Sequence, residues 1–551
     1  MIKSILWRKN VLLIIVVLTF LISACTQKGP ETTINKGLLK WEYFSDYIEA
    51  FNNSDDELYQ QYIPNDGADA FLENNIPYFQ CPDKELEEIY YFRWWTYRKH
   101  IKKTPVGFVI TEFLPDVSWS GKYNTISCPA GHHFYEGRWL HNPEFLKDYA
   151  LFWFKGEGNP RQYSFWAADA INRFLLVHPD SAFRDEMLPL LKHNLEEWKK
   201  ERKATDEKLF WQYDANDGME ITVSGAMMNK KPVFSAPSLR PTINSYMYGD
   251  LKALASLERE SGLSDLAVSH ENEAKILLTE VQERLWSSEL NFFHCLPQNK
   301  EADTPLEREL IGYVPWYFNL PQDGKGFEKA WIQIKDTTGF KAPFGPTTVE
   351  RRHPGFNISY EGHECQWNGP GWPFATTQTL KAMANLLRNY HQDVISKTDY
   401  LELLKTYTTS HSRKREDGKT VPWIDENLNP FTGDWISRTR LKTWDNGSWS
   451  AQKGGVERGK DYNHSGYCDL IISDLIGVRP EAGNQLRIHS LLPEETWNWF
   501  CLDRLKIRNH QLTIIWDKTG QKYNVGTGLL VYVDGILKVH QSDFNPVIIH
   551  F

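Results

Sequence analysis

Segments with a helical hydrophobic period alternate with long loops rich in Gly, Pro and Trp from residue 85 to residue 477, and this alternation constrains the fold. The segments of helical character are 85–103, 144–155, 162–177, 183–203, 243–261, 265–286, 326–335, 374–391, 398–411 and 465–476. With one or two more hidden in irregular loops, the total is roughly a dozen. Such a set of similar helices predicts a closed toroid of antiparallel helix pairs, the (α/α)6 barrel, in which the loops at one end line a funnel.

The sequence changes character after residue 480. Short alternating runs rich in Ile, Val and Leu, separated by the turn signals KTG and VDG, predict an antiparallel β-domain over 481–551. We therefore expect a mainly α protein: a barrel over 85–480 with this small C-terminal β-domain. A polar, partly helical tether and docking segment is expected over 25–84, with helical character in LLKWEYFSDYIEAFNN and SDDELYQQYI.

The N-terminus is typical of a targeting segment. Lys3, Arg8 and Lys9 precede the apolar run VLLIIVVLTFLI, and the segment ends in Ser-Ala-Cys at Cys25. This ending resembles a bacterial lipobox, so we expect 1–24 to be a lipoprotein signal peptide that is cleaved ahead of a lipidated Cys25. The protein would then be lipid-anchored in the bacterial cell envelope, at the outer membrane or the periplasmic face. An uncleaved anchor helix is the alternative, but a membrane span needs about 20 apolar residues.

Composition narrows the class of ligand. The formal net charge is −9 and no basic patch occurs, which disfavours a nucleic-acid partner. Aromatic residues make up 14% of the chain, with 22 Trp. Indole faces stack on the C–H faces of sugar rings, so a carbohydrate is a reasonable ligand, although packing of a large core explains the excess equally well.

The cysteines indicate neither a metal site nor another cofactor. Besides Cys25 they are Cys81, Cys128, Cys295, Cys365, Cys468 and Cys501. They lack the CxxC and Cys/His spacings of metal sites. Disulfides are conceivable in an oxidising compartment, but we expect isolated buried thiols.

Two acidic loops are candidates for chemistry. WQYDANDGMEITVSG, at 211–225, has no hydrophobic periodicity and places Asp217 and Glu220 around a turn between two helical segments. VPWIDENLNPFTGDW, at 421–435, presents an Asp-Glu pair ending at Glu426 before an Asn-Pro turn. Glycoside hydrolysis requires two carboxyl groups, one protonated and one ionised.

Three motifs carry a resemblance to a known family: DGME, WNGPGWPFATTQTLKAMANLL, and ENLNPFTG followed by WDNGSWSAQKGGVERGKDYNHSGYCDLIISDLIGVRP. In order, they resemble the S-G-[LM]-D turn, the W-x-G-P-x-W-P helix entry and the E-N-Y-x-P-x-T-G barrel end of glycoside hydrolase family 63 and its mannosylglycerate-hydrolase-like relatives. These are six-hairpin glycosidases. The resemblance covers roughly residues 85 to 480.

The resemblance implies that Glu220 is the general acid, that Glu426 is the general base, and that an α-linked sugar is hydrolysed with inversion. The family acid is usually Asp, so Glu220 would reach one methylene further, and Asp217 stays the alternative acid. Aromatic neighbours such as Trp211 and Tyr213 are expected to desolvate Glu220 and raise its pKa. Carboxyls roughly 6.5–9.5 Å apart favour inversion, and roughly 5–5.5 Å favours retention.

The Gly-Pro loop and the helix after it supply candidate substrate-binding residues, with structural Trp under the barrel rim as the alternative. These candidates are Trp367, Asn368, Trp372 and Gln378. Tyr213 is a further candidate. So is His464, although Asn463-His464-Ser465 stands where the family has aromatic-Trp-Ser.

A loop over 115–140, expected to lack helical order, supplies the rest: Trp119, His132, His133, Glu136, Arg138 and Trp139. Arg138 and Glu136 would grip hydroxyls or a substrate carboxylate, unless they pair with each other. The paired histidines have no third ligand at metal spacing, so a hydrogen-bonding role is favoured over zinc.

The leading hypothesis is an exo-acting, inverting glycoside hydrolase for an expected α-linkage in an oligosaccharide or polysaccharide, with no cofactor. A polysaccharide lyase is the second hypothesis, because helical toroids also host β-elimination by Tyr/His pairs and HHFYEGR supplies such groups. A non-catalytic glycan-binding surface lipoprotein is the third. The sequence leaves the oligomeric state open.

Overall fold

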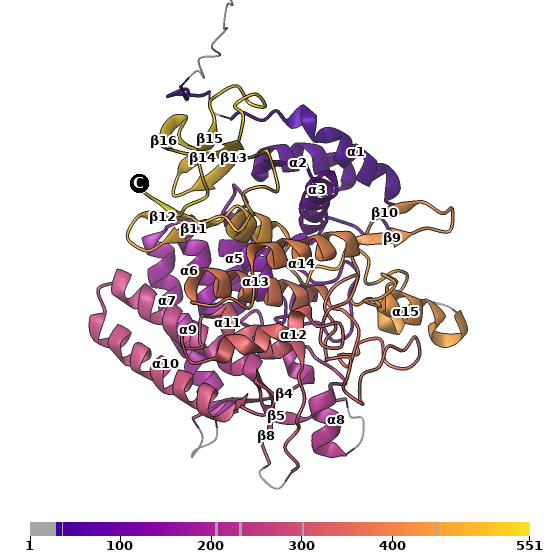
Figure 1. Cartoon of the computed structure of the whole chain (residues 1–551). Coiled ribbons are helices and arrows are strands. Elements are labelled where there is room, and N and C mark those ends of the chain that lie inside the picture. The colour runs from indigo at the N-terminus through magenta and orange to yellow at the C-terminus, as the bar shows by residue number, and fades with distance from the viewer. Residues whose placement is uncertain (1–28, 36, 204–207, 231–233, 300–301, 448) are drawn as a thin grey trace, which may run out of the picture.

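A computed structural model describes residues 29–551 except 36, 204–207, 231–233, 300–301 and 448. The chain forms a mainly α barrel with an antiparallel β-domain at its C-terminal end, and this confirms the predicted fold class (Figure 1). Cys25 and the signal-peptide segment lie outside the described residues. Within those residues, no helix is both long and apolar enough to span a membrane.

The barrel consists of an outer and an inner layer of helices that alternate along the chain. The outer helices are α3 (Lys84–Lys99), α5 (Glu144–Phe154), α7 (Ser181–Arg202), α10 (Ser264–Arg284), α12 (Ile332–Lys335) and α14 (Lys397–Ser410). The inner ones are α4 (Ala130–Gly137), α6 (Ala167–Val177), α9 (Pro241–Glu260), α11 (Val314–Tyr317), α13 (Pro373–Asn389) and a last helix whose π-helical part is η8 (Leu470–Leu475). Successive inner helices contact one another, and α14 contacts α3, so that the ring closes.

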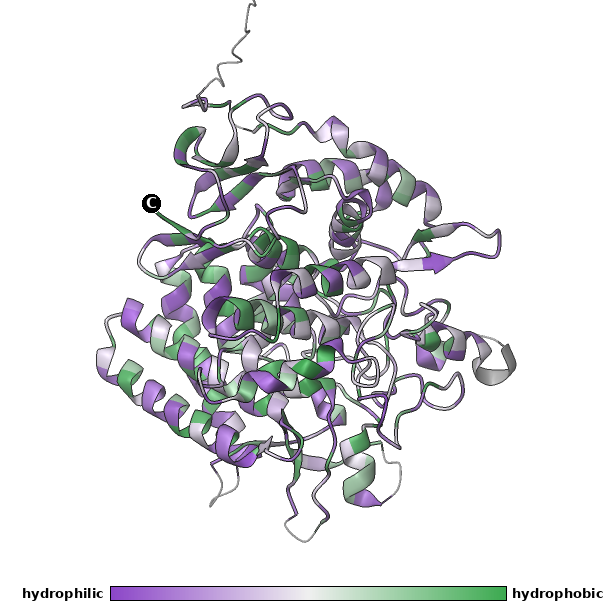
Figure 2. Ribbon diagram, viewed as in Figure 1, coloured by the Kyte–Doolittle hydropathy of each residue, from purple (hydrophilic) through white to green (hydrophobic). Residues whose placement is uncertain are grey.

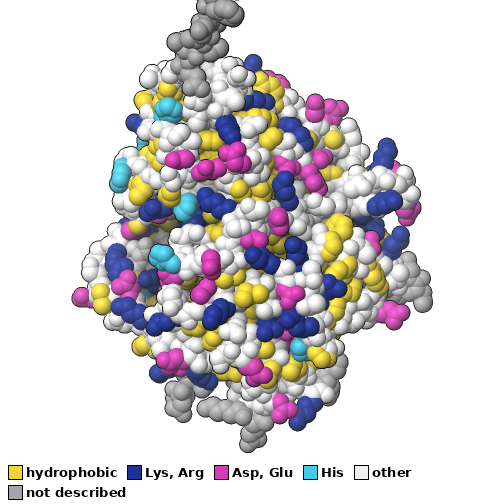
Figure 3. Space-filling model, in the orientation of Figure 1, with side chains coloured by type: hydrophobic (Ala, Val, Ile, Leu, Met, Phe, Trp, Pro, Cys, Tyr) yellow, Lys and Arg dark blue, Asp and Glu magenta, His cyan; other side chains and the backbone are white. Residues whose placement is uncertain are grey.

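Burial differs between the inner helix α13 and the outer helix α10. Every residue of α13 from Pro373 to Leu386 is buried. On α10, by contrast, burial follows a stripe at helical spacing that includes Ala267, Ala274 and Val281. Figure 2 shows hydrophobic and hydrophilic residues alternating along the outer helices α7 and α10. Acidic and basic side chains are interspersed across the face drawn in Figure 3.

The C-terminal β-domain contains two antiparallel sheets. One has the order β1-β13-β14-β15-β16 and the other β11-β12-β17. Their strands are β1 (Tyr78–Gln80), β11 (Val478–Glu481), β12 (Gln485–Ile488), β13 (Trp499–Ile507), β14 (His510–Asp517), β15 (Gly528–Val533), β16 (Ile536–Gln541) and β17 (Val547–His550). The edge strand β1 comes from the N-terminal segment, with Tyr78 opposite Asp503.

The N-terminal segment packs on α3 through α1 (Ser45–Ser54) and α2 (Ala68–Asn75). The Asp55 carboxylate is buried between Lys99 Nζ at 2.7 Å and Lys460 Nζ at 2.6 Å. Burial opposes ionisation of Asp55, but these two ammonium groups outweigh it and lower its pKa far below the usual value.

Short elements fill the loops between the barrel helices. They are α8 (Val223–Asn229), α15 (Ile436–Gly447), β2 (Ile101–Thr104), β3 (Gly107–Ile110), β4 (Trp211–Tyr213), β5 (Pro237–Leu239), β6 (Trp286–Ser287), β7 (Phe292–Phe293), β8 (Leu296–Pro297), β9 (Ser412–Lys414) and β10 (Thr420–Pro422).

The predicted long helices are present, with shifted ends in several cases. The segment 162–177 becomes helical only at Ala167, and 465–476 is largely π-helical. Three expectations are wrong. The run HHFYEGR, expected to lack helical order, forms α4 because its side chains pack inside the barrel. SDDELYQQYI is not helical, and α8 and α15 were not predicted.

Candidate active site

A cavity of about 260 Å³ lies in the barrel at the amino ends of the inner helices. Its lining consists of Glu112, Phe113, Trp119, Ile126, Cys128, Tyr163, Gly218, Glu220, Phe234, His363, Glu364, Cys365, Trp367, Trp372, Phe374, Glu426, Lys453, Arg458, Tyr462 and His464. Several of them directly precede an inner helix: Cys128 precedes α4, Tyr163 precedes α6 and Trp372 precedes α13. The inner helices therefore present the loops that the sequence analysis singled out to one shared space.

Glu220 lies on the loop between β4 and α8. Gly218 has φ +78°, and a Cβ there would lie 2.5 Å from Cys128 Sγ, so this turn requires glycine. Ile221, directly after the carboxylate, also has a positive φ of 53°, which is unusual for a β-branched residue. The backbone on both sides of Glu220 is thus held in conformations that the surrounding fold imposes.

The electrostatic environment of Glu220 favours its protonated form. The side chain is partly exposed because it faces the cavity, yet the protein around it desolvates the carboxylate. Burial, with a contribution from the negative charge of Glu426, raises the pKa of Glu220 to about 8. The group is therefore able to hold a proton at neutral pH.

Glu426 forms a buried ion pair with an arginine. Arg458 donates from Nε at 2.9 Å and from Nη2 at 2.5 Å to Glu426 Oε1, and both side chains are buried. The Cys365 thiol donates to the other oxygen, Oε2, at 3.5 Å. A paired, hydrogen-bonded carboxylate of this kind is a suitable proton acceptor.

Two further carboxyl groups line the cavity. Tyr462 donates a 2.5 Å hydrogen bond to Glu112, but burial dominates and raises the pKa of Glu112 to about 8. Burial also acts on Glu364, where Arg458 and a Lys453 ion pair at 2.5 Å outweigh it and lower the pKa to about 2. The cavity therefore combines protonated and ionised carboxyls.

Aromatic rings form much of the remaining lining. Trp367 and Trp372 stack with centroids 4.4 Å apart and planes at 13°. The Arg458 guanidinium lies 4.8 Å from the Trp119 ring centroid. Burial lowers the pKa of His464, whose ring packs 4.1 Å from that of Tyr462, so the imidazole is neutral.

Some of the residues predicted from the sequence meet in this cavity: Glu220, Glu426, Trp119, Trp367, Trp372 and His464. The others lie outside its lining. Among these, Asp217 is buried and its Oδ2 accepts from Arg240 Nε at 2.7 Å and from Thr242. Tyr213 is 37% exposed and packs on Trp211, so the predicted desolvation of Glu220 comes from other residues of the cavity.

The candidates on α4 and the residues after it hold the barrel together. Glu136 accepts from the backbone N–H groups of Tyr467, Cys468 and Asp469 at 3.2, 2.9 and 2.8 Å, which joins the last inner helix to α4. Arg138 and the Trp139 indole both donate to Asp469, at 2.6 and 2.8 Å.

The remaining candidates are His132, His133 and Gln378, which are buried, and Asn368, which is partly exposed. His133 contacts the Asn463 carbonyl oxygen at 2.6 Å, and His132 packs edge-on against Phe374. Gln378 donates to the Tyr246 hydroxyl at 2.7 Å, and the Asn368 carbonyl oxygen accepts from the backbone of Asn357. None of these four residues is part of the cavity lining.

Sequence reasoning missed several polar residues of the cavity: Glu112, Glu364, Lys453, Arg458 and Tyr462. Glu364 lies three residues before the WNGPGWP motif, and Arg458 lies inside the last of the three motifs quoted above. Glu112, which follows β3, carries no local signal, because only the tertiary fold brings it to the carboxylate pair.

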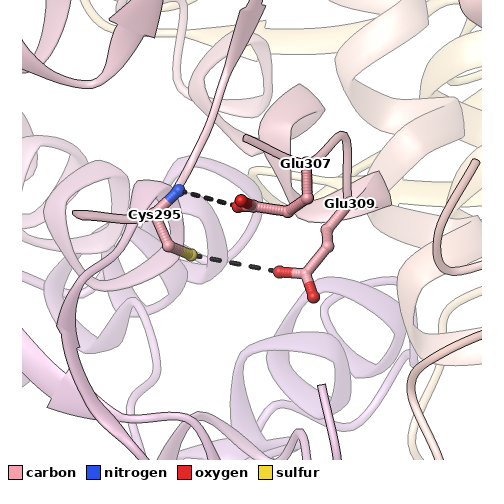
Figure 4. A group of neighbouring side chains, drawn as sticks. All are labelled: Cys295, Glu307 and Glu309. Carbon is pink, nitrogen blue, oxygen red and sulfur yellow. Dashed lines mark hydrogen bonds between the residues drawn. The ribbon is translucent and has the colours of Figure 1, made fainter. Parts of the chain in front are cut away.

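The sequence predicts no metal site, but one group of ligand-type side chains occurs within the described part of the chain. Atoms of Cys295, Glu307 and Glu309 lie within 4.8 Å of one another (Figure 4). Burial raises the pKa of Glu309, and the positive charge of Arg240 opposes that rise. The Arg240 guanidinium therefore already offsets negative charge at these three side chains. Glu309 also accepts from the Val223 and Ser224 N–H groups at 2.9 and 3.0 Å, which fixes the start of α8 next to the Glu220 loop.

Sequence and structure comparisons place these features among known proteins. The profile of the mannosylglycerate hydrolase MGH1-like glycoside hydrolase domain matches residues 122–465, and that of the glycosyl hydrolase family 65 C-terminal domain matches residues 478–537. A solved chain titled sialidase has 40% sequence identity and a TM-score of 0.83 over 93% of this chain, which spans only 45% of that chain.

Two further solved structures are more distant. A GH78 family rhamnosidase of a Bacillus species is similar in fold, with 11% identity and a TM-score of 0.50 over 80% of this chain and 40% of that one. A GH63 mannosylglycerate hydrolase from Thermus thermophilus, in complex with glucose, has 13% identity and a TM-score of 0.45 over 60% of this chain and 95% of that one. This last likeness is too remote to carry an argument.

Proposed function

The chain belongs to the mannosylglycerate hydrolase MGH1-like glycoside hydrolase family, as its motifs predicted, and on this premise we propose that it hydrolyses a glycosidic bond in an oligosaccharide or polysaccharide with Glu220 as general acid and Glu426 as general base. One observation carries the proposal. The two carboxyls line the same cavity, and one is desolvated while the other is paired with Arg458. Opposite environments for two carboxyls give them opposite roles.

In the proposed reaction, Glu220 donates its proton to the leaving glycosidic oxygen as the bond to the anomeric carbon breaks. Glu426 removes a proton from the water that attacks this carbon from the opposite face of the ring. The product then has the inverted anomeric configuration. Inversion and the α-linkage are what the family resemblance implies, and the position of the cavity inside the barrel supports exo-action on a terminal sugar.

In this proposal, the aromatic rings of the cavity bind the sugar. Trp119 and the stacked pair of Trp367 and Trp372 offer apolar faces to a sugar, and Glu112 offers a carboxyl to its hydroxyl groups. The similar chain titled sialidase makes sialosides one substrate class worth testing. Because this chain spans 45% of that chain, the titled activity can belong to a part that has no counterpart here.

The test combines a substrate screen with carboxylate variants. Aryl α- and β-glycosides, sialosides and oligosaccharides are offered to the protein, and NMR identifies the first-formed anomer. Glu426→Gln and Glu220→Gln should each lower kcat by about 10²–10⁴ on substrates with a poor leaving group, because general acid–base catalysis contributes that much. Glu416→Gln, a change at a 97% exposed carboxylate, is the control and should be without effect.

The outcomes separate the proposal from its alternatives. Near-parental turnover by Glu426→Gln contradicts the assignment of the base. An unsaturated uronide product indicates a lyase, although the HHFYEGR histidines of that hypothesis lie outside the cavity lining. Sugar affinity without turnover, retained in both variants, indicates a binding protein.

We further propose that Cys25 carries a lipid anchor that holds the enzyme in the bacterial cell envelope, as the lipobox-like ending suggests. Full-length protein expressed in a bacterium that processes lipoproteins is labelled with radioactive palmitate and partitioned into detergent. Labelling of the parent and its absence from Cys25→Ala supports the anchor. Equal labelling of Cys25→Ala contradicts it.

A further inference from the structure

A second cavity lies at the other end of the barrel, where the inner helices finish. Its volume is about 30 Å³, and it is lined by Tyr135, Arg138, Arg173, Leu176, Tyr317, Lys381, Asn385, Ser473, Val478, Arg479 and Pro480. Along α13, nine residues separate Trp372 in the catalytic cavity from Lys381 in this one, a rise of about 14 Å. It is therefore a site of its own.

The lining contains four cationic side chains and no carboxylate. Behind it, Asp469 pairs with Arg138 at 2.6 Å and with Lys381 at 2.8 Å. Asp474 pairs with Lys381 at 3.0 Å, with Arg388 at 2.8 Å and with Arg479 at 3.6 Å. Within the described residues, four cations thus share these two carboxylates, and the excess charge is positive.

Nearby acids do not remove this excess. Arg173 lies 3.4 Å from Asp169, a pair that is neutral by itself. Burial raises the pKa of Asp250, which lies beside Asp169, well above its usual value, so Asp250 adds no charge. Burial also raises the pKa of Glu136, and its opposing cation is Arg93.

The positively charged side chains of the lining repel one another, and one N–H donor among them has no acceptor. Burial, together with Arg388, Arg173 and Arg138, lowers the pKa of Arg479 to about 10, although Asp474 opposes this. Arg138 is only 4% exposed, and its Nε–H has no hydrogen-bond acceptor in the described part of the chain. A buried guanidinium N–H without an acceptor is costly. The partial negative charge at the carboxyl ends of the inner helices offsets part of this positive charge.

We propose that this cavity binds a small anion, with chloride as the representative species. The space exceeds the roughly 10–15 Å³ that one water molecule needs, and it is too small for a sugar. The anion would accept hydrogen bonds from Arg138 and Arg479 and neutralise the repulsion among the cations of the lining, whereas the three N–H groups of Lys381 are already directed at Asp469, Ser473 and Asp474. Exchange with solvent is possible past Arg173 and Arg479, whose side chains are 36% and 21% exposed.

The bound anion would stabilise the barrel. The lining joins α4, α6, α11 and α13 to the first strand of the β-domain, β11. A ligand that binds only the folded state raises the melting temperature in proportion to the logarithm of its concentration above its dissociation constant. Chloride should therefore stabilise the protein more than gluconate, a larger anion, at the same ionic strength.

The experiment uses the whole folded chain. Chloride is titrated while ³⁵Cl NMR line width and melting temperature are recorded, with gluconate holding the ionic strength constant. Crystals soaked in bromide are measured at the bromine absorption edge. We expect saturable line broadening, a chloride-dependent melting temperature and an anomalous peak between Arg138 and Arg479.

Variants at the cavity and a matched control complete the test. Arg479→Gln and Arg173→Gln, changes at the two partly exposed arginines of the lining, should each weaken chloride binding at least tenfold. Arg487→Gln removes an arginine of the neighbouring strand that pairs with Glu481 outside the cavity, and it should bind chloride as the parent does. If neither cavity variant folds, the bromide peak and the parental titration decide.

Three results would overturn the proposal. They are a cavity that holds only water in the bromide crystals, equal stabilisation by chloride and gluconate, or an Arg487→Gln variant that loses chloride binding as the cavity variants do. None of these three results bears on the proposed catalytic roles of Glu220 and Glu426.

Discussion

Arg458 grips a single oxygen of Glu426, Oε1, through two of its nitrogens, and leaves the other oxygen to the thiol of Cys365. Arg458 also lies 3.5 Å from Glu364, which in turn pairs with Lys453. The Arg458 guanidinium thus holds Glu426, the proposed base, by Oε1. The other oxygen, Oε2, accepts a much weaker hydrogen bond from the thiol.

The first prediction follows from this geometry. Arg458→Met leaves Glu426 buried without its cation, a loss that typically costs about 3–5 kcal/mol of stability. The acidic limb of kcat/KM against pH should also move to higher pH. Arg458→Lys keeps the charge and should recover part of both effects. An unchanged acidic limb in a folded Arg458→Met would contradict this role.

The second prediction concerns the alkaline limb of the pH profile. The pKa of Glu220 is raised to about 8, so the proposed acid loses its proton above that pH. We expect kcat/KM to fall about tenfold per pH unit above about pH 8, since kcat/KM reports ionisation in the free enzyme. Rates at constant ionic strength test this, and a limb that begins near pH 5 refutes the protonated state of Glu220.

The third prediction is that Glu220→Gln stabilises the protein at neutral pH. A carboxyl whose folded pKa is about 8 binds a proton that the unfolded chain releases near pH 4.3, so the free energy of unfolding falls as the pH rises between these values. Glutamine does not titrate, so the variant does not lose this free energy of unfolding as the pH rises. The melting temperature of the variant relative to the parent should increase between about pH 4.5 and pH 8. A difference that is constant across this window contradicts the prediction.

The fourth prediction separates binding from chemistry. Trp119→Ala removes an aromatic ring of the cavity that we propose contacts the sugar and that also packs against Arg458. We expect a higher KM, by about 10-fold if roughly 1.4 kcal/mol of contact with the sugar is lost. Trp211→Ala, a change outside the cavity, is the control. If both variants change KM equally, the effect is not one of substrate contact.

The fifth prediction tests the support of the acid loop. Glu309→Gln replaces Oε2, which accepts from the Ser224 hydroxyl at 2.9 Å, by an NH2 group, and the Glu220 loop should become less well positioned, with kcat lowered about tenfold and KM little changed. Glu307→Gln is the matched control, because Glu307 accepts from Cys295 and has no bond to α8. A fall in kcat that is equal in both variants would indicate a general loss of stability.

Local sequence predicted the scaffold and part of the site. The helical period predicted α9, α10, α13 and α14 within a few residues, because burial inside a barrel imposes that period. The two acidic loops were recognised because a glycine turn and an Asn-Pro turn interrupt that pattern.

The remaining features depend on distant parts of the chain. Glu112 and Tyr462 come together only when β3 meets the last barrel loop, and no local pattern encodes that distance. The paired histidines and Glu136 attracted a functional interpretation because buried polar residues look alike in sequence whether they close a ring of helices or bind a ligand.

The edge strand β1 pairs with β13, and the backbone N–H of Leu39 donates to Asp503 at 2.7 Å. During synthesis, β13 leaves the ribosome long after β1, because the whole barrel separates the two strands in the sequence. The N-terminal segment that carries β1 therefore has no partner strand until β13 has been synthesised, and it exposes an unpaired edge until then. Maturation of this protein is thus expected to depend on chaperones that shield nascent chains, and release of a truncated chain should leave an aggregation-prone N-terminal half.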